Sequence, residues 1–228
     1  RHRQSLPRGR AVKIALVNPN TSMEFTLRMV TIAAREAGTR AEVTGHTARF
    51  GVPLITDTAA LSVATEAVAA LAPALLEAHA AIVAAFSDPG LDALRGALPY
   101  PVTGIAEAGM AEAAKDGRRF AVVTTTPALI EAIAATAARH GHRRFAGTWT
   151  TPGDPVALTA NAAALDEALA TAIAAAIADG GAEAVVIGGG PLAEAARALA
   201  SRTPVPLIEP VPAAVRLSLE RLRMRATT

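Results

Sequence analysis

Short, continuous apolar runs alternate along the chain with longer stretches in which Ala and Leu recur at helical spacing. The first apolar run, VKIALV, covers 12–17, and a helical pattern follows it over 23–37. Strands that are apolar throughout are typical of parallel sheets with helices on both faces. The same pattern predicts further strands over 41–44, 81–85, 101–105, 120–123, 144–149, 184–187 and 205–208. It predicts further helices over 61–78, 91–98, 106–115, 128–140, 166–179, 192–200 and 212–223.

The two halves of the chain repeat this pattern with an offset of roughly 105 residues. VKIALVNPNTS corresponds to FAVVTTTPALI, AAIVAAFSDPGL to AEAVVIGGGPLA, and YPVTGIAEA to VPLIEPVPA. The repeat predicts an α/β fold with two pseudo-symmetric lobes, each a parallel four-stranded sheet flanked by helices. We expect an N-terminal lobe over 1–103 with its first ten residues disordered, a C-terminal lobe over 104–208, and a last helix, 209–228, that packs back on the first lobe.

Ligands of parallel sheets bind beyond the carboxyl ends of the strands. Two lobes that face each other would therefore place polar turns from both halves around one cleft. We expect this cleft to be the active site.

Composition narrows the kind of protein. No apolar run reaches the roughly 18 residues that cross a bilayer, so we expect a cytoplasmic protein with no membrane partner. Aromatic residues are 3% of the chain, too few for base stacking, and we expect no nucleic-acid partner. The chain has no cysteine, and no pair of histidines has metal-ligand spacing, so we expect no metal site. The Ala-rich helices suggest a homo-oligomer.

The first polar turn contains Asn18, Asn20, Thr21 and Ser22. It precedes a predicted helix, whose free N–H groups and dipole favour an anion. We predict that these side chains bind a small, anionic substrate. Ordinary N-capping of the helix is the alternative.

A second polar turn, Thr124, Thr125 and Thr126, begins the equivalent helix of the second half. Its hydroxyl groups are predicted to bind the substrate too, and capping is again the alternative.

The glycine-rich turn Gly188, Gly189, Gly190 and Pro191 lets the backbone approach a ligand closely. It is predicted to bind substrate, with a plain tight turn as the alternative. It matches neither the dinucleotide fingerprint nor a phosphate-binding P-loop.

The turn after strand 81–85 contains Phe86, Ser87, Asp88 and Pro89. We predict that Phe86 contacts the substrate and that Ser87 donates a hydrogen bond to it or acts as a weak nucleophile. Asp88 is a candidate acid/base group. The alternative for Asp88 is capping of the next helix, which would have Pro89 at its first position.

Glu209 follows the last strand, and Glu107 lies at what we take as the matching place in the first half. A carboxylate at the end of a strand can serve as a general base, with capping or a solvated charge as the alternative. His46 lies in a predicted loop near the cleft.

Five of these segments occur in the order found in the aspartate/glutamate/hydantoin racemase superfamily, and the chain resembles its hydantoin racemase branch from Val12 to Leu219. They are NPNTS at 18–22, DPGL at 88–91, GIAEAGM at 104–110, FAVVTTTP at 120–127 and IEPVPAAV at 208–215.

In such racemases two cysteines face each other across the cleft; one removes the α-proton and the other returns a proton on the opposite face. The resemblance places them at Ala85 and Gly189, so this chain lacks both thiols. It also implies that the residues with which the family binds a carboxylate or ureido group correspond to Asn18, Thr21, Ser22, Thr125 and Thr126.

The resemblance implies a cofactor-independent racemase or isomerase acting on a small amino-acid-, hydantoin- or dicarboxylate-like substrate. Its acid/base groups would be Asp88, Ser87, Glu209, His46 or bound water. Two alternatives stay open: a cofactor-free lyase of the decarboxylase type, and a binding protein that performs no chemistry.

Overall fold

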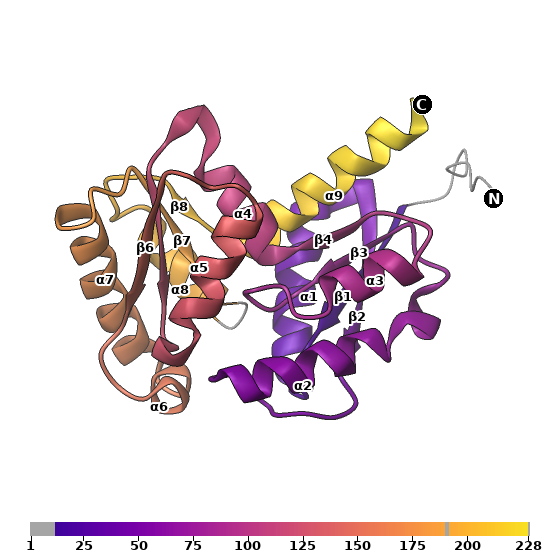
Figure 1. Ribbon diagram of the computed structural model, residues 1–228, viewed down its shortest axis with the longest axis horizontal. Helices are drawn as coiled ribbons and strands as arrows, with labels where there is room; N and C mark the ends of the chain where they lie inside the picture. Colours follow the sequence, from indigo (N-terminus) through magenta and orange to yellow (C-terminus); the bar gives the residue numbers. More distant parts are fainter. Residues whose placement is uncertain (1–11, 190–191, 228) are drawn as a thin grey trace.

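A computed structural model describes residues 12–189 and 192–227. The chain forms two α/β lobes that lie side by side (Figure 1). Each described lobe holds one parallel four-stranded sheet, with the strand order β2-β1-β3-β4 in the first and β6-β5-β7-β8 in the second. The two orders are the same when strands are counted from the start of each half. The predicted α/β fold class and the predicted repeat are therefore confirmed.

The first sheet and the helices that follow its strands come from the N-terminal half. Their bounds are β1 Val12–Asn18, α1 Met23–Ala37, β2 Ala41–Thr47, α2 Thr58–Ala69, β3 Ala80–Val83, α3 Leu91–Ala97, β4 Val102–Gly104 and α4 Ile105–Ala113.

The second sheet repeats this order. Its elements are β5 Phe120–Thr124, α5 Ile130–Arg139, β6 Phe145–Thr150, α6 Pro155–Thr159, α7 Ala162–Ala178, β7 Ala184–Ile187, α8 Ala193–Ala200, β8 Leu207–Ile208 and α9 Pro210–Ala226.

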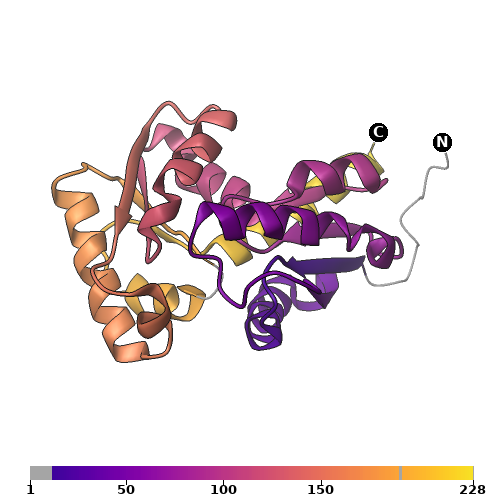
Figure 2. The same ribbon diagram turned by 60° about the horizontal axis from the view of Figure 1, so that its bottom comes forward.

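Strands β1, β3, β5 and β7 form the centres of the sheets because their side chains are apolar on both faces. On the first sheet, Ile14 and Leu16 pack toward α1, whereas Ala15 and Val17 pack with α2 and α3. Figure 2 shows α1 and α2 on opposite sides of this sheet. Each strand therefore buries both faces, as its continuous apolar sequence predicts.

Helices α4 and α9 each pack against the lobe that the other half of the chain forms. Each follows the last strand of its own half, and the two pack closely against each other. Helix α4 also packs on β7 and α5 of the second lobe, while α9 packs on α1, β3 and β4 of the first. Figure 1 shows α9 crossing from the second lobe over the first. One hydrophobic cluster consequently runs through both lobes, so neither lobe has a core of its own on that side.

Most predicted elements lie within a few residues of the observed ones, with one clear correction. The helix expected over 61–78 ends at Ala69, and a separate 3₁₀ turn, Ala72–Leu75, follows it. Pro73 explains the break, because proline has no N–H to continue a helix. The first ten residues, for which disorder was expected, lie outside the described part of the chain. Within the described part, no helix is long and apolar enough to span a bilayer.

Candidate functional site

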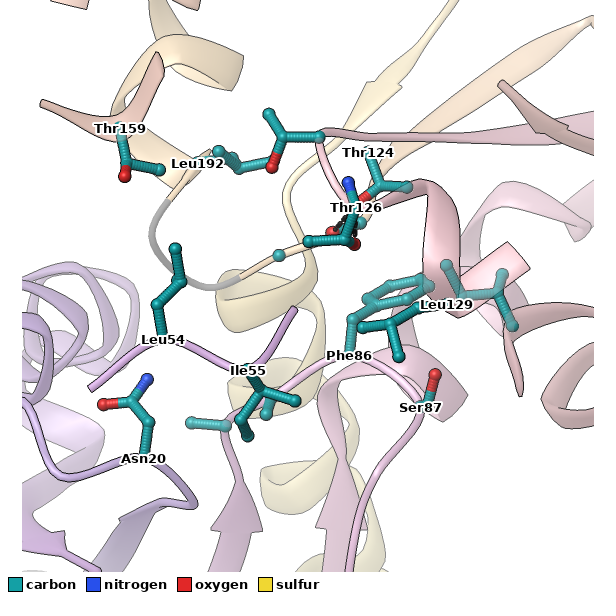
Figure 3. A pocket seen from close by; sticks show the side chains of 16 residues that line it. Asn20, Leu54, Ile55, Phe86, Ser87, Thr124, Thr126, Leu129, Thr159 and Leu192 are labelled. Carbon is teal, nitrogen blue, oxygen red and sulfur yellow. Dashed lines mark hydrogen bonds between the residues drawn. The ribbon is translucent and has the colours of Figure 1, made fainter. Parts of the chain in front are cut away.

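A cavity lies between the lobes at the carboxyl ends of the central strands (Figure 3). It leaves about 60 Å³ for solvent-sized molecules. On this measure one water needs ~10–15 Å³, so the space suits a ligand of a few non-hydrogen atoms. The described lining is Asn20, Leu54, Ile55, Ala84, Ala85, Phe86, Ser87, Thr124, Thr125, Thr126, Leu129, Ile133, Thr159, Gly188, Gly189 and Leu192.

Ala85 and Gly189 occupy equivalent points of the two lobes. The N–H of Ala84 donates to the carbonyl of Val17 (2.8 Å), and the N–H of Gly188 donates to the carbonyl of Val123 (2.7 Å). Ala85 and Gly189 are the next residues, and both line the cavity. The two positions to which the resemblance assigns the family's cysteines therefore bound one cavity from opposite lobes.

The first polar turn is held together from within. The side-chain amide of Asn18 donates to Asn20 Oδ1 (2.8 Å) and to Thr26 Oγ1 (3.0 Å), and Asn18 is fully buried. Ser22 caps α1 by accepting from the N–H of Phe25 (3.2 Å). Ser22 is therefore the N-cap of α1, whereas Asn18 holds the turn together from within.

Asn20 is the part of this turn that reaches the cavity, whereas Asn18, Thr21 and Ser22 are outside the described lining. Its Oδ1 also accepts from the N–H of Ser22 (2.9 Å), but its Nδ2 bonds to no described residue. Figure 3 draws that nitrogen on the side of Leu54. Asn20 can therefore donate to a ligand.

The threonine turn repeats this arrangement in the second lobe. Thr124 Oγ1 donates to the carbonyl of Gly188 (2.8 Å) and lies 3.0 Å from Thr126 Oγ1. Because Thr124 has one hydroxyl hydrogen, Thr126 is the donor in the second bond. The hydroxyl of Thr125 bonds to no described residue. Thr125 is thus the donor that this turn offers to the cavity.

Ser87 lines the cavity with a buried hydroxyl that has no hydrogen-bond partner among the described residues. Its φ of 78° lies in the left-handed region, which is uncommon for a residue with a side chain. A buried polar atom without a partner costs free energy in the empty cavity. Ser87 is therefore available to a ligand.

Asp88 does not belong to the described cavity lining. Its two carboxylate oxygens accept from the N–H groups of Ala106 and Glu107, each at 2.8 Å, at the start of α4. An ideal Cβ on Gly104 would lie 2.1 Å from the Asp88 carboxyl carbon, so the glycine makes room for this contact. The alternative given above, that Asp88 caps the helix directly after it, is wrong in its target: the capped helix is α4, and α3 begins at Leu91, with Gly90 as its N-cap residue and no side-chain cap.

Burial raises the pKa of Asp88 to about 7, although the N–H groups of Ala106 and Glu107 act in the opposite direction. Asp88 is 3% exposed, and its carboxyl group faces the start of α4 rather than the cavity. It is therefore poorly placed to exchange a proton with a ligand.

Glu107 and Glu209 each lie outside the described lining as well. Burial acts to raise the pKa of Glu107, but Arg221 (2.6 Å) and Arg95 (2.7 Å) outweigh it and lower the pKa to about 2. Glu209 pairs with Arg197 at 2.9 Å. Both carboxylates therefore serve ion pairs.

The expected match between Glu107 and Glu209 needs correction. Glu209 precedes α9 as Gly104 precedes α4, so the residue equivalent to Glu209 is Gly104. His46 lies on β2, opposite Val17, and is also outside the described lining. Among the described residues, no group of three or more potential ligands could hold a metal ion.

The predicted substrate-binding residues that line the cavity are Asn20, Phe86, Thr124, Thr125, Thr126, Gly188 and Gly189. Gly190 and Pro191 lie outside the described part of the chain. Sequence reasoning missed Leu54, Ile55, Leu129, Ile133, Thr159 and Leu192. The repeat does not predict Leu192 as a lining residue, because the residue equivalent to it, Asp88, lies outside the described lining.

Comparison with known proteins agrees with this geometry. Residues 14–218 match the family model described as Asp/Glu/Hydantoin racemase. A hydantoin racemase of Rhizobium meliloti is 34% identical over 138 residues, which are 60% of this chain and 57% of that protein. The matched segment therefore spans little more than half of that racemase.

Solved structures match over nearly the full length. An allantoin racemase from Klebsiella pneumoniae is 30% identical with a TM-score of 0.87, covering 94% of this chain and 88% of that one. The allantoin racemase of Pseudomonas fluorescens is 27% identical with a TM-score of 0.88, covering 93% and 92%. These relatives support an enzyme of the isomerase class, and the chain belongs to the Asp/Glu/hydantoin racemase family.

Proposed function

We propose that this protein is a cofactor-independent, racemase-type isomerase that acts on a small hydantoin-like or amino-acid-like molecule held between its lobes. The observation that carries the proposal is the position of Ala85 and Gly189 at equivalent points of one cavity. The similarity to hydantoin and allantoin racemases supports the substrate class. Cytoplasmic location and homo-oligomeric assembly stay part of this proposal.

The lining favours a ring amide over a dicarboxylate. None of the described lining residues has an ionisable side chain, so a doubly charged ligand would find no counter-charge there. The free donors are the amide of Asn20 and the hydroxyls of Thr125 and Ser87. Such donors suit carbonyl oxygens, which gain negative charge when the neighbouring carbon loses its proton.

Because the described lining offers no strong base, we assign the proton transfer to water. A water takes the proton from the ring carbon, and the electron pair of the C–H bond moves into the adjacent carbonyl. Asn20, Thr125 and Ser87 would stabilise the resulting enolate through hydrogen bonds. A second water on the opposite face donates a proton to the carbon, which inverts its configuration, and the hydronium and hydroxide ions that the two waters have become then neutralise each other.

The test is proton exchange at the ring carbon of enantiopure 5-methylhydantoin in D₂O, followed by NMR together with optical rotation. We expect exchange and loss of rotation to be faster with the protein than in buffer. Replacement of Ser87 by Ala should slow both, whereas replacement of the exposed Leu27 by Ala should not. Rates equal to those in buffer, for hydantoins, allantoin and free amino acids alike, would contradict the proposal.

A second candidate, a binding protein without catalytic activity, is favoured by the same lack of ionisable groups in the described lining. It would be recognised by a ligand that raises the melting temperature without exchange at its carbon. A cofactor-free decarboxylase stays a prediction, to be tested by CO₂ release from substituted malonates.

A further inference from the structure

Two leucines from opposite lobes narrow the cavity. Leu54 lies on the segment between β2 and α2, and Leu192 lies just before α8. Figure 3 shows Leu54 extending from the first lobe toward the side on which Leu192 lies. Both line the cavity, and neither was expected to do so from the sequence.

The segment that carries Leu54 is fixed to the first polar turn. The N–H of Ala48 donates to the carbonyl of Asn18 (2.9 Å), and the N–H of Thr21 donates to the carbonyl of Val52 (3.0 Å). At the other end, Asp57 caps α2 by accepting from Ala60 (2.8 Å). Leu54 is therefore held at a set position relative to the donor Asn20, which belongs to the same turn.

Leu192 reaches into the space beside Gly189. An ideal Cβ on Gly189 would lie 3.2 Å from Leu192 Cγ and 3.3 Å from Cδ1, which is tighter than ordinary van der Waals contact. Leu192 is 2% exposed and packs in the core of the second lobe, so it has little room to retreat. The missing side chain at Gly189 thus does not widen the cavity on this side.

The remaining space decides what a ligand can carry. A cavity of about 60 Å³ between these walls favours a small ring with few exocyclic atoms over a ring with a bulky substituent. With the polar atoms of the ring bound to Asn20 and Thr125, a substituent on the ring carbon has to meet the apolar walls. Interiors resist overfilling, because added groups force neighbouring side chains out of their preferred rotamers.

We propose that Leu54, together with Leu192, determines specificity by limiting the ligand to a ring carbon with a short apolar substituent. This inference rests on the proposed function, since it takes a hydantoin-like ring as the ligand. It assigns to Leu54 a role in selecting the substrate and no role in the proton transfer.

The test compares the binding of three probes, namely hydantoin, 5-methylhydantoin and 5-benzylhydantoin, by isothermal titration calorimetry. The wild-type protein should bind 5-methylhydantoin at least tenfold more tightly than 5-benzylhydantoin. In Leu54→Ala this ratio should fall at least fivefold. Leu54→Val, which removes less of the side chain, should give an intermediate ratio. The control Leu27→Ala, at an exposed position, should keep the wild-type ratio.

The outcomes separate this inference from the proposed function. If the wild-type protein binds the probes but Leu54→Ala and Leu54→Val keep its ratio, the role of Leu54 is overturned and the proposed function stands. Equal affinity of the wild-type protein for the methyl and benzyl compounds would overturn it as well. If no probe binds to any of the proteins, the proposed substrate class fails and the role of Leu54 fails with it.

Discussion

The turn after β3 and the turn after β7 occupy equivalent places in the two lobes but have different chemistry. Asp88 follows Ala85 by three residues and binds two N–H groups at the start of α4. Leu192 follows Gly189 by three residues and lines the cavity. The repeat therefore uses the same backbone position once as a polar cap and once as an apolar wall.

The two helices that follow the last strands of the two halves also begin differently. The first turn of α4 offers the N–H groups of Ala106 and Glu107, whereas α9 begins with Pro210 and has Pro212 two residues later. Proline has no N–H, so α9 has fewer free donors to satisfy. Glu209, the N-cap residue of α9, makes no side-chain cap bond, whereas Asp88 binds the start of α4.

The largest expected effect comes from placing a cysteine in each of the two turns, at Ala85 and at Gly189. The double variant Ala85→Cys with Gly189→Cys, in which Leu192 has to shift by a few tenths of an ångström, should racemise 5-methylhydantoin at least about 10⁴-fold faster than the wild-type protein, because a positioned acid and a positioned base each contribute ~10²–10⁴-fold. Decay of optical rotation measures this. The two single variants are the controls, and a folded double variant no faster than either would show that the two positions do not act on one ligand.

Asp88→Ala tests the turn after β3, in which Asp88 binds the start of α4. The change leaves the buried N–H of Ala106 and the partly buried N–H of Glu107 without acceptors, at ~1–3 kcal/mol each, so at pH 4, where the carboxyl group is uncharged in the folded protein, the free energy of unfolding should fall by about 3 kcal/mol. Glu209→Ala is the matched change beside α9 and should cost about 1 kcal/mol or less, because Glu209 only pairs with the partly exposed Arg197. Urea titrations compare the two variants. Equal losses would mean that the two helix starts do not differ as described.

The ion pairs of Glu107 in α4 make the stability of this part of the protein depend on pH. The pKa of Glu107 is lowered from 4.5 to about 2, so its contribution to stability is present above pH 4.5 and is lost as the pH falls through 2. Glu107→Gln should therefore cost about 2 kcal/mol at pH 7, with solvent screening allowed for, and almost nothing near pH 2. The free energy of unfolding of both proteins, measured from pH 7 down to pH 2, checks this dependence. A loss of stability in Glu107→Gln that grows toward low pH would contradict it.

The smallest effect concerns Ser87, which carries a side chain at a φ of 78°. Ser87→Gly should raise the free energy of unfolding by about 1 kcal/mol, because glycine adopts this conformation without strain. It should also weaken the binding of 5-methylhydantoin about fivefold through the loss of one hydrogen bond. Ser87→Ala should weaken binding equally without the gain in stability. Unchanged binding in both variants would remove Ser87 from the ligand site.

Much of the fold could be predicted from the sequence because its signal is periodic. Strands such as β1 and β5 are apolar on both faces, and the helices between them recur in both halves. The exception at Ala69 has a local cause, Pro73, which outweighed a long Ala-rich pattern.

The site was less predictable, since its walls depend on tertiary placement. Leu54 lies in an irregular segment with no periodicity, and only the backbone bonds to Asn18 and Thr21 bring it to the cavity. The role of Asp88 was open between acid/base chemistry and capping. The deciding feature is Gly104, which is distant in sequence and leaves room for the carboxyl group.

The most direct measurement is a crystal structure of the protein with bound 5-methylhydantoin. We predict that the ring carbon lies between Ala85 and Gly189, with the ring oxygens within hydrogen-bond distance of Asn20, Thr125 or Ser87. A ligand bound outside this cavity, or bound with none of these contacts, would contradict the account.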